Sequence, residues 1–249
     1  MSGGNGDSIG RMKRWTDVSD DPNSPAALQF RRQTLAAARR PPVPDRTAYL
    51  QDLCRGRRVL DVGVVDHTVE SGQPLHRAIA SVAGYCLGVD ILEGPVNRLR
   101  EQGFNVRKCD ITRDDVGEQF DVMVVGEVIE HLGNPAGLFA AGGRVLSPGG
   151  RMVLTTPNPF YMARARDNLR GRCFDSVDHV TYLFPSGIAE LAEREGLRLD
   201  AYRGVKVSKD QAGSFGGRMM LRLHGMLSGG VLAPEAACET MIYECVKPT

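Results

Sequence analysis

The side chains best suited to catalysis or metal binding follow the apolar run at residues 120–125. Glu127, Glu130 and His131 come directly after this run, and on a helical turn they would share one face. His179 follows a later strand-like run. Two carboxylates and two imidazoles can hold a divalent cation, where oxygen ligands favour Mg²⁺ and imidazole ligands favour Mn²⁺. Because such a cation lowers the pKa of a bound hydroxyl, these four residues are a candidate metal site for hydroxyl chemistry.

The elements that must position these side chains alternate between short apolar runs and helical stretches. This alternation predicts an α/β fold, a Rossmann-like, doubly wound and mostly parallel seven-stranded sheet with an N-terminal helical extension. Ligands bind such sheets at the carboxyl ends of the strands. The expected strands are residues 57–62, 85–90, 105–109, 120–125, 152–156, 197–207 and 240–246, the last two including an antiparallel edge. The expected helices are 25–40, 45–54, 73–83, 94–102, 135–147 and 185–195, with a turn at 146–150.

Small and acidic residues stand at the ends of the expected strands. Gly63 follows the first strand and permits a sharp turn with close approach of a ligand, although an ordinary strand-to-helix turn would also fit. Asp90 ends the second strand and can accept both hydroxyls of a ribose. Asp110 and Ile111 follow the third strand and can bind an adenine amino group and cover the ring. The first loop lacks the further glycines that a dinucleotide pyrophosphate requires, so the pattern disfavours NAD and FAD.

This order of strand ends resembles the class I S-adenosylmethionine-dependent methyltransferases over residues 45–207. The resemblance implies S-adenosylmethionine as the cofactor. It implies the cofactor-binding set Asp61, Gly63, Val64, Val65, Asp66, His67, Asp90, Ile91, Asp110, Ile111, Gly126, Glu127 and Val128. Residues 65–67 depart from the usual Gly-x-Gly and are similar to the Gly-x-Val-Asp-His loop of a subset of bacterial and archaeal members. Which residues hold the methionine carboxylate therefore stays open, and His67 is an additional candidate base.

The Glu-x-x-Glu-His segment is similar to two groups within that family. These are the ubiquinone-biosynthesis O-methyltransferases and the small-RNA 3′-terminal 2′-O-methyltransferases, in which the set holds a divalent metal. Many metal-free class I methyltransferases also carry a Glu-His pair here for helix capping and packing, so both interpretations stay open. Without a metal, His131 or His179 is the candidate general base, because imidazole titrates near neutral pH. Glu127 completes the candidate catalytic set, and His76 and His224 are assigned no role.

Arginine residues gather in two places along the chain. The segment 160–174 contains four Arg and one Asp. Arg164, Arg166 and Arg170 in this segment are candidates to hold a phosphate or carboxylate of the substrate, and a solvated helix face is the alternative. The second group comprises the Arg pairs at 31–32 and 39–40 on the first expected helix, which would close over the site as a lid or simply face solvent.

Composition sets limits on the class of protein. The 249 residues include 31 Lys and Arg against 30 Asp and Glu, and the formal net charge of +1 argues against a generic polyanion binder. The chain shows no apolar signal segment, no run long enough for a membrane span and six scattered cysteines without a Cys-x-x-Cys pair, so we expect a cytoplasmic protein with reduced thiols. We expect two parts: a tail and helix at 1–44, and a methyltransferase domain at 45–249 with a Gly-rich insertion near 208–238. A short helix is expected near 218–227.

Together these inferences predict an O-methyltransferase that acts on a polar small molecule, such as a sugar, a nucleotide-sugar or another natural-product intermediate. The arginine segment allows an anionic substrate, and a membrane partner is not expected. 2′-O-methylation of an RNA end is the first alternative, although the balanced charge and the lack of a separate RNA-binding module disfavour a nucleic-acid partner. A non-catalytic S-adenosylmethionine-binding protein is the second alternative, motivated by the altered first loop and opposed by the set Asp90, Asp110 and Glu127. The oligomeric state stays open.

Overall fold

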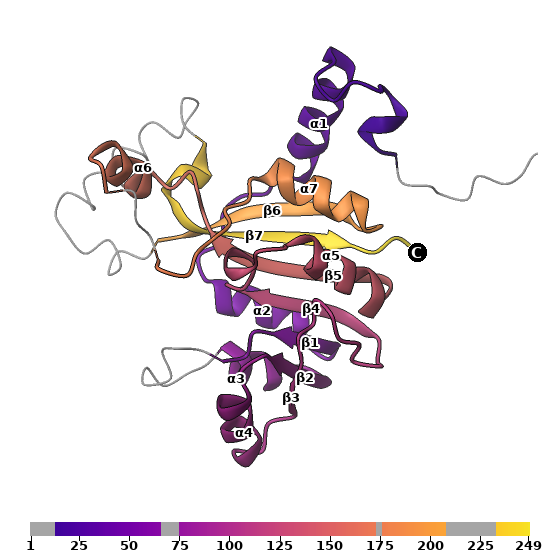
Figure 1. Ribbon diagram of the computed structural model, residues 1–249, viewed down its shortest axis with the longest axis vertical. Helices are drawn as coiled ribbons and strands as arrows, with labels where there is room; N and C mark the ends of the chain where they lie inside the picture. Colours follow the sequence, from indigo (N-terminus) through magenta and orange to yellow (C-terminus); the bar gives the residue numbers. More distant parts are fainter. Residues whose placement is uncertain (1–12, 66–74, 173–175, 208–232) are drawn as a thin grey trace, which may run out of the picture.

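The computed structural model describes residues 13–65, 75–172, 176–207 and 233–249, which build a seven-stranded sheet with helices on both faces (Figure 1). The strand order is β3-β2-β1-β4-β5-β7-β6. Strand β7 runs antiparallel to both of its neighbours, and the other pairs are parallel. The strands are β1 (Arg58–Val62), β2 (Tyr85–Asp90), β3 (Val106–Lys108), β4 (Phe120–Gly126), β5 (Leu146–Pro157), β6 (Arg198–Lys206) and β7 (Cys238–Val246). The predicted fold is confirmed, with the antiparallel strand placed between β5 and the edge strand β6.

The order of the strands also fixes where a ligand can enter. The chain moves outward from β1 to β3 and then returns to β4 beside β1, so the carboxyl ends of β1 and β4 flank a topological switch point. The α-helices among the described residues are α1 (Pro25–Ala38), α2 (Arg46–Cys54), α3 (Leu75–Ala80), α4 (Glu93–Glu101), α5 (Ala136–Val145), α6 (Met162–Leu169) and α7 (Pro185–Arg194). Short 3₁₀ helices are η1 (Trp15–Asp17), η3 (Ile129–His131) and η4 (Pro234–Ala237). No helix among the described residues is long and apolar enough to cross a membrane.

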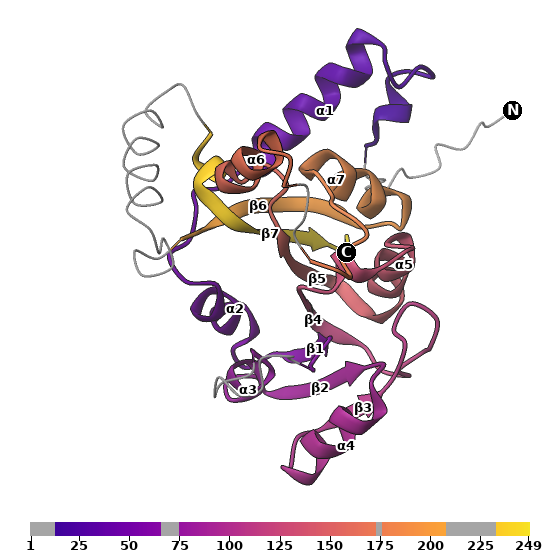
Figure 2. The same cartoon turned by 60° about the vertical axis from the view of Figure 1, so that its left-hand side comes forward.

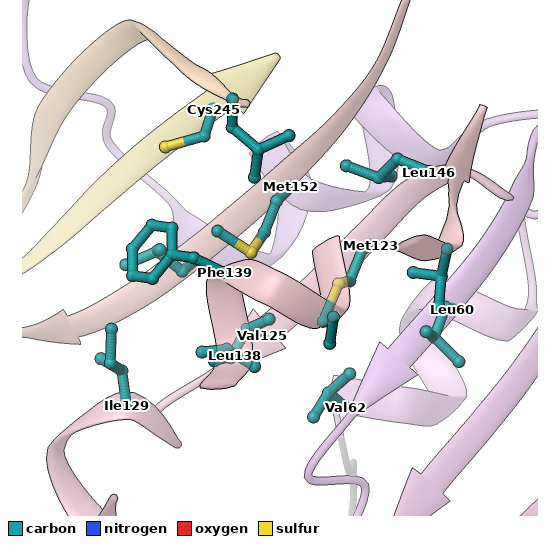
Figure 3. Packing of buried hydrophobic residues seen from close by; sticks show 14 of the residues in the cluster. Leu60, Val62, Met123, Val125, Ile129, Leu138, Phe139, Leu146, Met152 and Cys245 are labelled. Carbon is teal, nitrogen blue, oxygen red and sulfur yellow. The ribbon is translucent and has the colours of Figure 1, made fainter. Parts of the chain in front are cut away.

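The core divides into two layers because successive strand residues face opposite sides of the sheet. On one side, Leu60 and Met152 join a buried cluster with residues of α5 and α7, and Figure 3 shows Phe139 of α5 beside Met152. On the other side, Val59 and Val124 pack against α2 and α3. Each fully buried side chain of this size stabilises the fold by about 1.5–3 kcal/mol.

The N-terminal helix α1 lies beyond the edge strand β6 (Figure 2). Ser24 accepts a hydrogen bond from the backbone N–H of Ala27, and Pro25 occupies the first turn, so the helix begins where the sequence predicts. Arg31 pairs with Glu190 and Glu193 of α7, at 2.8 Å and 2.7 Å respectively. This Arg therefore anchors α1 to α7, and closure of α1 over the site stays a prediction.

The chain around residues 146–150 differs from the predicted turn. These residues belong to β5, and the pairing with β4 shifts from Phe120↔Leu146 to Val122↔Arg151. The backbone groups of Gly149 and Gly150 bond to Lys247 beyond the end of β7, which keeps them in the sheet. The turn residues therefore form a bulge. The helix predicted near 218–227 lies outside the described residues.

Candidate active site

A cleft of about 610 Å³ opens at the carboxyl ends of strands β1 to β4. Every predicted cofactor residue that the structure describes lines it: Asp61, Gly63, Val64, Val65, Asp90, Ile91, Asp110, Ile111, Gly126, Glu127 and Val128. Asp66 and His67 lie outside the described residues. The strand ends therefore converge on one site, as the parallel sheet predicts.

The turn after β1 approaches the loop after β4 closely. Gly63 has a φ of +76°, a left-handed conformation that favours glycine. A Cβ at this position would overlap the side chain of Val128. The backbone N–H of Val65 donates to the Asp90 carboxylate at 3.0 Å, which joins the same turn to the end of β2. Gly63 therefore serves both the turn and the contact between two loops of the cleft.

Two carboxylates on the next strand ends are held in place by short local hydrogen bonds. Asp90 also accepts from the backbone N–H of Leu92 at 2.9 Å. Asp110 accepts from the backbone N–H and the hydroxyl of Thr112, at 3.1 Å and 2.6 Å. A carboxylate offers about four lone-pair sites, so both groups keep acceptor capacity for a ligand. Ile91, which is 63% exposed, adds an apolar wall between them.

The residue after β4 has an unusual backbone. Glu127 has a φ of +53°, the only positive value at a non-glycine among the described residues. Such strain costs on the order of 1–3 kcal/mol and is concentrated at functional sites. Its carboxylate accepts from the guanidinium of Arg46 at 3.0 Å. Arg46 was not predicted, since a first-turn residue of α2 gives no sequence signal for the cleft, yet it is the only Arg or Lys among the described lining residues.

Three of the four predicted metal ligands come together. One ligand atom from each of Glu130, His131 and His179 lies within 4.8 Å of the others. Glu130 is 1% exposed; one carboxylate oxygen accepts from Thr156, and the other has no hydrogen-bond partner among the described residues. Burial and the nearby Glu127 carboxylate raise the pKa of Glu130 to about 8. Glu127 lies near enough to Glu130 to influence its pKa but pairs with Arg46, so its place in the metal set stays a prediction.

Backbone hydrogen bonds bring the distant His179 to the end of β4. The carbonyl of Glu130 accepts from the N–H groups of Val180 and Thr181, at 2.8 Å and 3.1 Å. The ring centroids of His131 and His179 are consequently 4.9 Å apart.

Asp178 completes this corner of the site. Its carboxylate lies 3.1 Å from Nδ1 of His131, and both side chains line the cleft. A carboxylate beside one nitrogen of an imidazole orients the ring and leaves the other nitrogen for a reacting group.

A histidine to which the sequence assigned no role also lines the cleft. His76 of α3 is buried, and its Nδ1 lies 2.8 Å from the Asp61 carboxylate. The intervening loop length hides this pairing from sequence reasoning, because residue spacing gives no distance across a loop. Only the alternation of β1, which turns Asp61 toward the α2 and α3 side as it does Val59, would have indicated the face from which a partner comes.

The predicted substrate-binding arginines are not among the described residues of the cleft wall. Arg164 donates to the carbonyl of Asn158, and Arg166 pairs with Asp167 at 2.9 Å. Arg170 follows α6, a helix that has no buried residue. These contacts fit the alternative of a solvated helix face, and substrate binding by the three arginines stays a prediction.

The strand order, the cleft at β1 and β4 and its acidic strand ends define the Rossmann-like fold of class I S-adenosylmethionine-dependent methyltransferases. The chain belongs to the family described as methyltransferase domain, whose model matches residues 30–202. The methyl donor of this class, and the cofactor of this chain, is S-adenosylmethionine.

Similar proteins agree with this assignment. Among curated relatives, the ubiquinone biosynthesis O-methyltransferase of Dechloromonas aromatica is 27% identical over 164 residues, which covers 60% of this chain and 68% of the relative. The Pseudomonas aeruginosa protein of the same name is 35% identical over 111 residues, 41% of this chain and 45% of the relative.

Solved structures show the same fold. An S-adenosylmethionine-dependent methyltransferase from Mesorhizobium loti superposes with a TM-score of 0.53 at 18% identity, covering 80% of this chain and 96% of that one. The N-methyltransferase NodS from Bradyrhizobium japonicum, in complex with S-adenosylhomocysteine, gives 0.51 at 14% identity, covering 93% and 94%.

Proposed function

We propose that this protein transfers the methyl group of S-adenosylmethionine to a hydroxyl of a polar small molecule. The observation that carries the proposal is the cluster of Glu130, His131 and His179 at the end of β4, next to the cleft. Transfer to a hydroxyl requires removal of a proton with a high pKa, and this cluster offers two ways to do so. The relatives named as O-methyltransferases support the same chemistry.

The cleft divides into regions that suit the parts of the cofactor. Asp90 would accept the ribose hydroxyls, and Asp110 with Ile111 would bind adenine. The turn at Gly63 would receive the methionine backbone. Arg46 is the cation available to its carboxylate, because a guanidinium binds carboxylates through parallel hydrogen bonds. When bound, the cofactor supplies an electrophilic methyl group, and the protein aligns the acceptor with it.

The cluster at the end of β4 fits a divalent cation. The second oxygen of Glu130 is buried without a partner among the described residues, and ligand atoms of Glu130, His131 and His179 lie within 4.8 Å of one another. A buried ionised carboxylate is unfavourable unless a cation or a proton neutralises it. Glu130, His131 and His179 would hold the ion, with Mn²⁺ favoured over Mg²⁺ by the imidazoles. The ion would lower the pKa of the acceptor hydroxyl.

A metal-free route uses the same corner of the site. His131 receives its orientation from Asp178 through Nδ1. Its Nε2 is then the atom that would take the hydroxyl proton as the acceptor approaches the methyl group. With a metal bound, His131 would be a ligand and not the base, and the lowered pKa of the acceptor hydroxyl would take the place of the base.

Methyl transfer from labelled S-adenosylmethionine to a panel of acceptors tests the proposal. The panel should hold sugars, nucleotide-sugars and phenols, each beside an amine of matched shape. We expect label in hydroxyl acceptors, and His131→Ala should reduce the rate at least about 100-fold because general base catalysis contributes that much. Transfer to the amines alone would contradict O-methylation. Binding of NAD in preference to S-adenosylhomocysteine would contradict the cofactor assignment.

Replacing Glu130 by Gln is expected to separate metal binding from folding. Gln is an isostere of the protonated acid and can still accept from Thr156, so the melting temperature of the metal-free protein at pH 7 should stay near the wild-type value. Binding of Mn²⁺, measured by calorimetry, should weaken at least about tenfold because a carboxylate ligand is lost. Glu101→Gln, on the exposed surface of α4, is the matched control. Equal Mn²⁺ affinity in both variants would count against a metal at this cluster.

A further inference from the structure

His76 lines the cofactor cleft but takes no part in the function proposed above. Its Nδ1 lies 2.8 Å from an oxygen of Asp61, and the two residues are 2% and 3% exposed. The hydrogen bond therefore joins α3 to β1 in the interior of the protein. Asp61 directly precedes the segment Val62–Val65, which forms the wall of the cleft at the end of β1.

The neighbouring strand leaves room for the imidazole ring. Gly88 pairs with Asp61 in the register between β1 and β2. A Cβ at Gly88 would lie 2.7 Å from Cε1 of His76, too close for any side chain to be accommodated without movement. Glycine inside a strand weakens it and often marks close approach of another group. The ring of Phe104 meets the imidazole edge-on, with centroids 5.3 Å apart.

Leu75, the first residue of α3, also packs closely against a glycine, in this case Gly126 at the end of β4. A Cβ at Gly126 would lie 2.9 Å from Cδ2 of Leu75. The start of α3 thus rests against glycines of both β2 and β4, and His76 fastens it to the strand between them. The adjacent strands β2, β1 and β4 are therefore held relative to one another beside the cleft.

We propose that His76 is a positioning residue for S-adenosylmethionine binding, which acts by holding Asp61 and so preorganising the wall Val62–Val65. The inference rests on the cofactor placement proposed above. Without the imidazole, a buried carboxylate would lose this hydrogen bond and be drawn toward water. The ligand-free protein would then spend less time in the binding-competent conformation. Affinity would fall in proportion to that population.

Three substitutions at His76 test the role with S-adenosylhomocysteine as the calorimetric probe. His76→Leu removes the donor, and we expect the Kd to rise about 10- to 100-fold, the equivalent of one unpaired buried polar group. His76→Asn places an N–H near the position of Nδ1, so we expect affinity within roughly threefold of wild type. His76→Gln places its N–H near the position of Nε2, and we expect it to behave like His76→Leu.

The pattern distinguishes a positioning role from simple packing. A packing role would rank the variants by volume and give Leu and Gln affinities no worse than that of the smaller Asn, which would overturn the proposal. Should His76→Leu fail to fold, as judged by circular dichroism, the comparison of Asn with Gln decides, and equal affinities overturn it. In a background of Asp61→Asn, His76→Leu should cost much less affinity because no buried charge is stranded.

The same titrations test the cofactor placement and the positioning role of His76 separately. If wild-type protein fails to bind S-adenosylhomocysteine, the cofactor placement is wrong and His76 is not the cause. If wild-type protein binds it and His76→Leu binds it equally well, only the positioning role is wrong.

Discussion

Replacing Asp90 by Ala is expected to weaken binding of S-adenosylhomocysteine about 100-fold or more. The carboxylate would accept hydrogen bonds from the ribose, each worth about 1.5–3 kcal/mol because the acceptor is charged. It also accepts from the backbone N–H groups of Val65 and Leu92, so its loss would release the turn after β1 as well. Isothermal titration calorimetry on the purified protein measures the change directly.

Two matched variants complete that experiment. Asp90→Asn keeps one acceptor oxygen and should bind with intermediate affinity. Asp52→Ala removes an exposed carboxylate on α2, outside the described wall of the cleft, and should leave binding unchanged. If Asp90→Ala bound the probe within about threefold of wild type, the ribose would lie elsewhere in the cleft.

Replacing Glu244 by Ala is expected to lower the free energy of unfolding by about 3–5 kcal/mol, the usual effect of stranding a buried charge. Glu244 lies in β7 and is 3% exposed. Its carboxylate accepts from Arg151 at 2.7 Å, Arg203 at 3.1 Å and the hydroxyl of Tyr49 at 2.5 Å. Truncation would leave two guanidinium groups without this partner. Urea denaturation followed by circular dichroism gives the change in stability.

The same strand offers the control for this prediction. Glu239→Ala removes an exposed carboxylate of β7 and should change stability by no more than about 0.5 kcal/mol. Tyr49→Phe removes one hydroxyl and keeps the ring over which Arg203 stacks, so it should cost about 1 kcal/mol. A Glu244→Ala protein as stable as Glu239→Ala would mean that the buried network contributes nothing.

Features that depend on the order of the strands or on local backbone conformation were predictable from the sequence. Asp90 and Asp110 stand at strand ends, and because parallel strands end at one edge of a sheet, their meeting in one cleft follows from the order of the elements. Gly63 follows from the same reasoning, since its positive φ is a local property of the turn. Most helix boundaries also follow from local signals, such as the serine cap and proline at the start of α1.

Contacts between side chains of different elements could not be predicted from the sequence. Arg46 reaches Glu127 only because α2 packs on the sheet, and no residue spacing indicates this ion pair. His76 reaches Asp61 across a loop whose path no spacing rule describes. The glycines at 149 and 150 indicated a turn, yet their bonds to Lys247 depend on a strand almost one hundred residues away. In each case a tertiary partner decided the outcome.

The contact between Gly63 and Val128 has a consequence for how this site can change during evolution. Any side chain at 63 would occupy the space that Val128 fills. The residue at one of these positions therefore limits which residues the other position can accept. Val128 lines the cleft, and a larger side chain there would press on the turn at Gly63, where we propose that the cofactor binds. We therefore expect a change of acceptor to involve cleft residues outside this contact, such as Leu132, more often than Val128.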